Sequence, residues 1–167
     1  MQLLACGIDE REVVTEQEAK SIGHEETFMA DITDVDTARR ELLVLSERVG
    51  RRMRKVGVRG RTVTLKVKYS DFKPVTRALR LNEATDDGSG IYSAVCGLLQ
   101  KTQMGKRPVR LLGVYVTGLC FPEEVEQLSF FGQDQRSEKK KRLNAALDSL
   151  REKHGYRSIR PGALVRD

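Results

Sequence analysis

The sequence predicts an α+β domain: a four-stranded, mostly antiparallel sheet with two helices on one face, followed by a tail that contains a helix. Three observations predict this fold class. Residues 61–69 alternate strictly between polar and apolar side chains, which is typical of a strand with one buried face. Apolar residues recur at spacings of three and four after Asp34 and again after Asp87, which is typical of helices. From residue 20 to residue 119 the elements follow the order β-α-β-β-α-β, whose natural packing has two layers.

The composition limits the classes of protein to which the chain can belong. Its 167 residues are enough for one compact domain and a tail, and 32% of them are charged. It has no apolar run of roughly 18 residues, so a membrane span is excluded, and its N-terminus lacks the pattern of a secretory signal. The net charge of +6 favours a polyanionic partner. The three cysteines form no CxxC or Cys/His cluster, which argues against disulfides and zinc and for a cytoplasmic compartment.

The first strand and the first helix are expected before residue 58. A strand is expected at 20–28, "KSIGHEETF", where the isolated Gly23 indicates a close backbone approach or a bulge. A helix follows, with Asp34 or Asp36 suited to cap its first turn and Gly57 suited to end it. Its apolar stripe consists of Leu42, Leu45, Val49, Met53 and Val56.

The clearest strand is 61–69, "RTVTLKVKY". Its inward side carries Val63, Leu65 and Val67, and its outward side carries Thr62, Thr64, Lys66 and Lys68. Residues 70–73, "SDFK", fit a turn into a second strand at 74–81. The alternation of that strand is less clean, because Val75 and Arg77 fall on one face, and a bulge is one way to resolve it.

The second half of the domain and the tail follow the same rules. After Asp87 we expect a helix with Ile91, Val95, Leu98 and Thr102 on one face, and at 107–119 a last strand with Leu112, Val114 and Val116 on one face. Gly, Pro and Glu residues then mark a linker. Ser137 is suited to cap a tail helix whose apolar side carries Leu143, Ala146, Leu147 and Leu150. The basic run at 139–142 is expected to be a solvated face of that helix.

The residues offer no convincing catalytic site. Neither His24 nor His154 belongs to a constellation with Cys, Ser or Asp that indicates nucleophilic catalysis. The segments "DITDVD" (31–36) and "DDGSG" (86–90) are better explained as helix caps than as a calcium loop or a phosphate loop. We therefore expect no cofactor in this chain and no catalysis by this chain alone.

The uncovered face of the predicted sheet is more informative. It is expected to carry hydroxyl and cationic groups from Thr62, Thr64, Lys66, Lys68, Thr76, Arg77, Arg80 and Arg110. Such a flat field suits a phosphate backbone better than base edges. Two alternatives stay open. An exposed antiparallel face is often simply polar, and RNA-recognition modules share this topology, although they need aromatic residues on the central strands.

Five segments follow one another along the chain: "KSIGHEETF", "TVTLKVKYSDF", "VTRALRL", "RLLGVYVTGL" and "QLSFF". In this order they resemble the little-finger domain of bacterial Y-family DNA polymerases of the DNA polymerase IV type. The resemblance covers about residues 7–131 and continues more loosely into the tail. It implies a domain that lies in the major groove of template-primer DNA and holds mostly its backbone. With the open-face residues added, the predicted DNA-binding set is Lys20, Ser21, Gly23, Thr64, Lys66, Thr76, Arg77 and Arg110. Tyr115 stands where some relatives have a basic residue.

The resemblance also implies a longer parent protein. Members of that family are Mg²⁺-dependent, low-fidelity polymerases that copy past damaged bases, and their catalytic carboxylates and metal sit in a palm domain that would precede Met1. The chain is accordingly divided into a linker from the thumb domain (1–19), the little-finger domain (20–119), a second linker (120–136) and a helical tail (137–167). If the resemblance fails, the alternative is a protein-interaction or nucleic-acid-binding module of the ferredoxin-like type without a polymerase parent.

The segment "EQLSFFG", residues 126–132, follows the last predicted strand. It is similar to the pentapeptide Gln-Leu-Ser/Asp-Leu-Phe that binds the bacterial sliding clamp, with Phe130 in place of the usual Leu. The resemblance assigns clamp binding to Gln127, Leu128, Ser129, Phe130 and Phe131. The alternative is a short strand or a flap that closes over the core. We favour a displayed motif, because the predicted sheet is already complete at Leu119.

Overall fold

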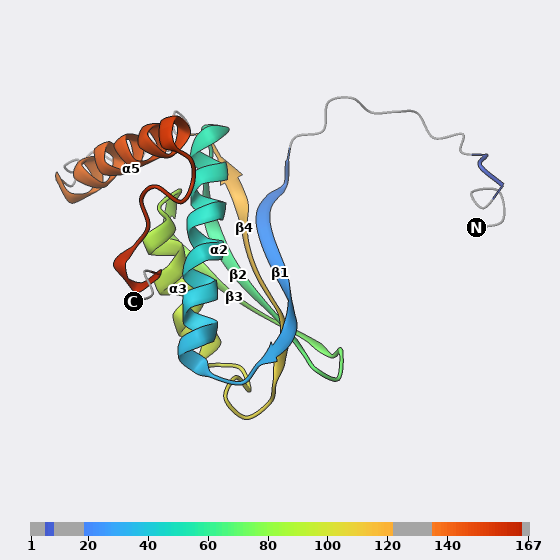
Figure 1. Ribbon diagram of the computed structural model, residues 1–167. Coiled ribbons are helices and arrows are strands. Elements are labelled where there is room, and N and C mark those ends of the chain that lie inside the picture. Colours follow the sequence, from blue (N-terminus) through green and yellow to red (C-terminus); the bar gives the residue numbers. More distant parts are fainter. Residues whose placement is uncertain (1–5, 9–18, 122–134, 165–167) are drawn as a thin grey trace.

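The computed structural model describes residues 6–8, 19–121 and 135–164. Its elements are β1 (Ser21–Ile32), α2 (Val35–Lys55), β2 (Arg59–Tyr69), β3 (Pro74–Thr85), α3 (Gly88–Leu99), β4 (Val109–Cys120), α5 (Gln135–His154) and the 3-10 turn η1 (Gly162–Leu164). The strands form one antiparallel sheet in the order β1-β4-β2-β3, and α2 and α3 cover one of its faces (Figure 1). The predicted fold class is confirmed.

The core lies between the helices and the sheet, where the periodicities place it. Three of the stripe residues on α2, Leu42, Val49 and Met53, are fully buried. Val56 is an exception to the predicted stripe: it is 56% exposed, because α2 ends at Lys55 and Gly57 turns the chain with a φ of +69°. From the sheet, the fully buried residues include Val63, Leu65, Val67, Leu112, Val114 and Val116.

Two carboxylates start the two helices of this layer. Asp34, not Asp36, caps α2, and its Oδ2 accepts a hydrogen bond from the Thr37 amide at 2.7 Å. Asp87 caps α3 in the same way, with Oδ2 accepting from the Gly90 amide at 3.2 Å. The helical periods of the sequence therefore begin where a free N–H group meets a side-chain oxygen.

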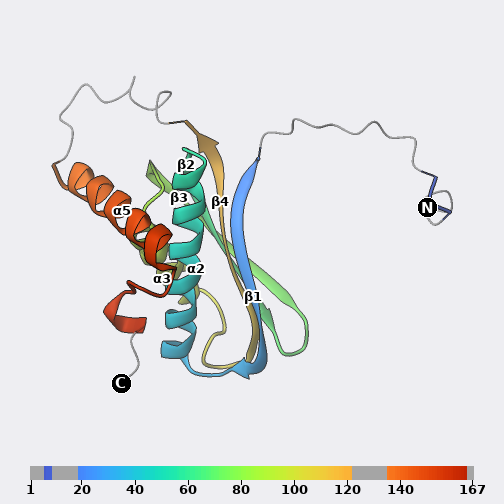
Figure 2. The same ribbon diagram turned by 45° about the horizontal axis from the view of Figure 1, so that its top comes forward.

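The tail helix α5 lies against the helical layer, away from the opposite face of the sheet (Figure 2). It begins earlier than the predicted cap at Ser137, and the predicted apolar side is not buried: Leu143 is 59% exposed and Leu150 is 40% exposed. Instead, Asp148 receives two hydrogen bonds from Arg54 of α2, at 2.7 Å and 3.1 Å. The docking of α5 is thus polar.

No helix within the described ranges is both long enough and apolar enough to cross a membrane. The predicted clamp-binding residues, Gln127 to Phe131, lie outside the residues that the structure describes.

Candidate functional site

The uncovered face of the sheet, here called the open face, is defined by four rows of side chains that cross the strands. Cross-strand partners share a face, so the pairing register fixes the rows. In the order β1, β4, β2, β3 the rows are Ser21, Thr117, Thr62, Arg80; Gly23, Tyr115, Thr64, Ala78; Glu25, Gly113, Lys66, Thr76; and Thr27, Leu111, Lys68, Pro74. Hydroxyls, cations and one aromatic ring therefore share one surface.

The predicted DNA-binding residues separate into three groups: five on the open face, Lys20 and Arg110 near the ends of strands, and Arg77 on the other face. Ser21, Gly23, Thr64, Lys66 and Thr76 lie on the open face, as the register shows. Lys20 is exposed directly before β1, and Arg110 lies in β4 next to the β2–β3 hairpin.

Arg77 lies on the other face, so its assignment to the open face is wrong. It pairs with the buried Leu65, and its Nε donates to the Lys101 carbonyl at 3.1 Å, at the end of the helical layer. The irregularity that we considered for β3 occurs only beyond Arg80, where the register shifts. Arg77 consequently keeps the parity of Val75.

The ring of Tyr115 explains why Gly23 is a glycine. A Cβ at Gly23 would lie 2.1 Å from Cδ1 of that ring. The close approach that the isolated glycine indicated is therefore that of a side chain from β4. The Tyr115 hydroxyl donates to Glu25, and burial together with this carboxylate raises the pKa of Tyr115 to about 12.

Glu25 places a negative charge among the cations of the open face. The Lys66 ammonium donates to its Oε2 at 2.8 Å, and hydrogen bonds from Lys66 and Tyr115 lower the pKa of Glu25. Sequence reasoning missed this residue, although its parity with Gly23 along β1 was a sufficient signal. The charge of Lys66 is therefore partly neutralised before any ligand arrives.

The β2–β3 hairpin carries a second group that sequence reasoning missed. Phe72 is 60% exposed, and its ring has the Arg110 guanidinium 5.1 Å from its centroid and the Lys68 ammonium at 5.5 Å. Arg110 is also 3.5 Å from Asp31. The segment "SDFK" was correctly predicted as a turn, but turn-forming residues alone do not indicate that its phenylalanine contacts two cations.

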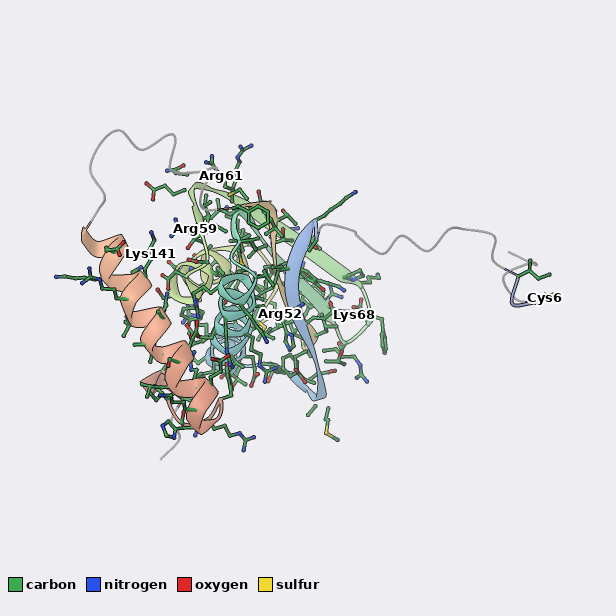
Figure 3. The ribbon with its side chains drawn as sticks, turned by 90° about the horizontal axis from the view of Figure 1, so that it is seen from above. Cys6, Arg52, Arg59, Arg61, Lys68 and Lys141 are labelled. Atoms are coloured by element: carbon green, nitrogen blue, oxygen red, sulfur yellow. The ribbon has the colours of Figure 1, made fainter. Side chains whose placement is uncertain are left out.

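Cations of α2 reach the edge strand β1 from the helical side. Arg52 donates to the Gly23 carbonyl at 2.7 Å, and Arg48 lies 3.0 Å from His24 Nε2 and 3.7 Å from Glu26. Burial, followed by Arg48, lowers the pKa of His24. Figure 3 shows Arg52 on the α2 side of β1 and Lys68 on the other side. Basic groups therefore flank β1 on both faces.

A pocket of about 750 Å³ lies where α5 meets α2 and the β3–α3 turn. Asp87 stands at its wall. Burial alone would raise the pKa of this carboxyl, but hydrogen bonds from Ser89, Lys140 and Asn144 bring it down to about 2. Two ion pairs join α5 to the rest of the pocket wall: Arg54 pairs with Asp148, and Lys140 pairs with Asp87 at 3.1 Å. The pocket thus lies along the seam where α5 docks.

Within the described part of the chain, no group of three or more His, Cys, Asp or Glu side chains could hold a metal ion. The fold and the open face define a binding module of the β-α-β-β-α-β type, whose exposed sheet suits an extended anionic ligand.

The chain belongs to the impB/mucB/samB family: the pattern of the impB/mucB/samB family C-terminal domain matches residues 19–130. A DNA polymerase IV of Desulfatibacillum aliphaticivorans is 45% identical over 163 residues, which cover 98% of this chain and 41% of that protein. A DNA polymerase IV of Clostridium kluyveri is 36% identical over 170 residues, covering 97% and 42%. The chain thus spans about two-fifths of the length of these relatives.

Two solved structures share the fold. One is a complex of a beta-clamp processivity factor and the little finger domain of PolIV, with a TM-score of 0.50 and 23% identity over 58% of this chain and 86% of that one. The other is a Y-family DNA polymerase chimera, with a TM-score of 0.54 and 20% identity over 72% of this chain and 34% of that one.

Proposed function

We propose that this chain is the DNA-holding little-finger module of a longer Y-family DNA polymerase of the DNA polymerase IV type. The observation that carries the proposal is the open face, where hydroxyls and cations from all four strands lie in register in a chain whose relatives are DNA polymerases. A flat sheet has no protruding element that could enter a DNA groove and contact the base edges. This face therefore suits backbone phosphates rather than base edges.

The proposed contacts are made by two kinds of donor. The cations Lys20, Lys68, Arg80 and Arg110 supply attraction, and the hydroxyls of Ser21, Thr64 and Thr76 supply neutral hydrogen bonds that fix the register of the backbone. Lys66 joins them once it exchanges Glu25 for a phosphate. Gly23 contributes by leaving room for the ring of Tyr115.

A fluorescence-anisotropy titration with primer-template DNA over a series of salt concentrations tests the proposal. The log–log slope should be about −0.9 for each phosphate neutralised. The chain offers a matched pair of variants on one strand: Arg80→Ala removes a cation of the open face, and Arg77→Ala removes one from the other face. We expect Arg80→Ala to weaken binding to all sequences alike and Arg77→Ala to leave it unchanged. Absence of DNA binding at low ionic strength would contradict the proposal.

We propose the catalytic properties for the parent protein only. In it, Mg²⁺-dependent nucleotide transfer past damaged bases would be performed by carboxylates outside this chain, in a cytoplasmic, nucleoid-associated protein that acts in DNA repair. In this arrangement, 1–19 joins the thumb domain, 20–119 holds DNA, 120–136 carries the clamp motif and 137–167 is the tail. Support comes from the relatives named DNA polymerase IV, of which this chain covers about two-fifths.

We further propose that Gln127, Leu128, Ser129, Phe130 and Phe131 bind the bacterial sliding clamp. The sequence match supports this proposal, and one structural relative is itself a little finger solved with a beta-clamp. A few apolar anchors can dominate such a contact. In a pull-down with purified clamp, Leu128→Ala with Phe131→Ala should abolish capture. The control replaces the exposed leucines Leu143 and Leu150 of α5 with alanine and should retain it. Equal capture of both variants would refute the assignment.

A further inference from the structure

The β2–β3 hairpin holds an aromatic side chain in a strained backbone conformation. Phe72 has a φ of +62° and is the one non-glycine residue with positive φ among the residues described. The loop has three residues, Ser70 to Phe72, between the paired Tyr69 and Lys73, and its last position is the left-handed one for which glycine is the favoured residue. A bulky residue there is a genuine outlier and costs free energy.

The surrounding contacts fix this conformation. The Phe72 amide donates to the Tyr69 carbonyl at 2.9 Å, and the Tyr69 amide donates to the Lys73 carbonyl at 3.2 Å. Asp71 accepts from the Lys73 amide at 3.3 Å and from Arg107 at 2.5 Å. Strain that is held by so many contacts is a feature of sites with a function. A glycine would satisfy the turn, so the ring itself must account for the phenylalanine.

The ring does not serve the core, because 60% of Phe72 is exposed. It serves two cations instead. Lys68 and Arg110 both lie over this ring, at 5.5 Å and 5.1 Å from its centroid, although their like charges repel. Lys68 belongs to the last row of the open face, so the pair stands at the hairpin end of that surface.

We infer that Phe72 is a positioning residue that gathers Lys68 and Arg110 into a binding site for the phosphates of a DNA backbone. This inference rests on the proposed function and adds to it a site and a residue. The ring restricts both side chains before DNA arrives, which lowers the entropy lost on binding. Strain in the loop is the cost of that preorganisation. Asp31, 3.5 Å from Arg110, holds the guanidinium until a phosphate replaces it.

The test compares thermal stability with DNA affinity in the same variants. Phe72→Gly removes the ring and the strain without changing charge, so its Tm should equal or exceed that of the wild type while its affinity for primer-template falls several-fold. The log–log salt slope should become shallower by up to about 1.8, because two cations lose their positions. Phe72→Tyr and Phe72→Trp, which keep an aromatic ring, should retain the wild-type affinity. Phe72→Leu should lose affinity as Phe72→Gly does. Val56→Ala, an equally exposed apolar side chain at the end of α2, should change neither quantity.

A second series separates positioning from direct contact. In a chain that already carries Lys68→Ala and Arg110→Ala, Phe72→Gly should cause no further loss of affinity. A further loss would show that the ring touches DNA itself and would overturn the inference, as would wild-type affinity and slope in Phe72→Gly or a lowered Tm in that variant. If the wild-type chain bound no DNA, the proposed function would fail first, and that outcome is distinct from the others.

Discussion

The docking of α5 depends on a buried ion pair, and removing one partner gives a measurable local effect. The Arg151 side chain is only 3% exposed, its Nη1 donates to Glu47 Oε2 of α2 at 3.2 Å, and its Nε donates to the Ile159 carbonyl at 3.2 Å. The ring of Tyr156 lies 5.4 Å from the guanidinium. Glu47→Gln would leave this cation buried without its anion.

The size of the loss of protection is limited because α5 lies on the surface of the domain. Stranding a charge inside a rigid core costs about 3–5 kcal/mol. Here α5 can leave the surface and return Arg151 to water, so the loss cannot exceed the free energy that docks the helix. A hydrogen bond to a charged group contributes about 1.5–3 kcal/mol. We therefore expect amide protection in α5 to fall by roughly 10-fold or more, at 1.4 kcal/mol for each factor of ten, while protection in the sheet stays the same.

Hydrogen exchange measured by mass spectrometry resolves the two regions. The control is Glu41→Gln, which removes the same charge from the same helix at a residue outside the described hydrogen bonds and ion pairs between α2 and α5. Equal loss of protection in α5 and the sheet would show that the tail unfolds only with the domain. Unchanged protection in α5 would show that the Arg151 pair contributes nothing to docking. Either result would refute the reasoning.

Three further predictions concern the open face and the start of α3. Gly23→Ala should cost about 1–3 kcal/mol of unfolding free energy in urea by overpacking, and should cost little in a Tyr115→Ala background, since the ring 2.1 Å from the added Cβ is then gone; equal costs would contradict the contact. Glu25→Gln should tighten DNA binding and steepen the salt slope by up to about 0.9, because Lys66 is released for a phosphate; unchanged affinity would mean that Lys66 does not bind DNA. Because the pKa of Asp87 is lowered from 3.8 to about 2 in the folded state, its stabilisation is present above about pH 4 and is lost as the pH falls toward 2, by about 1 kcal/mol after solvent screening. Urea titrations at both pH values should show this loss in the wild type and not in Asp87→Asn.

The fold could be predicted from the sequence because its two periods are strong. Strict alternation in β2 and the apolar stripe on α2 each show which side of the element is buried. The buried sides face one another in the core, so these two patterns predict how the layers pack. The ends of elements were harder. β1 continues to Ile32 although its alternation breaks, because pairing with β4 resumes at Val109 after an irregularity that no local pattern reports.

The open face was predicted in outline, and its particular contacts were not. Parity along a strand places Lys66 and Lys68 outward, but only the register across strands shows that Glu25 neutralises the first and that Phe72 holds the second. Arg77 was misplaced although its shared parity with Val75 already indicated the helical side, because no bulge separates the two residues in β3. The tail failed for a different reason: a stripe of leucines predicts burial only where a helix has an apolar surface to meet, and α5 meets charged residues.

Ion pairs occur on both layers: Lys66 pairs with Glu25 on the open face and Arg110 pairs with Asp31 beside it, while other pairs dock α5 on the helical layer. On the helical layer, Arg54, Arg151 and Lys140 are each paired with a carboxylate across the seam of α5. On the open face, Lys68 and Arg80 make no ion pair within the described residues. These two cations are therefore available to attract a polyanion that approaches the open face. Because α5 docks on the helical layer, where Lys140 reaches Asp87 and Arg151 reaches Glu47, the tail helix leaves the open face uncovered (Figure 2).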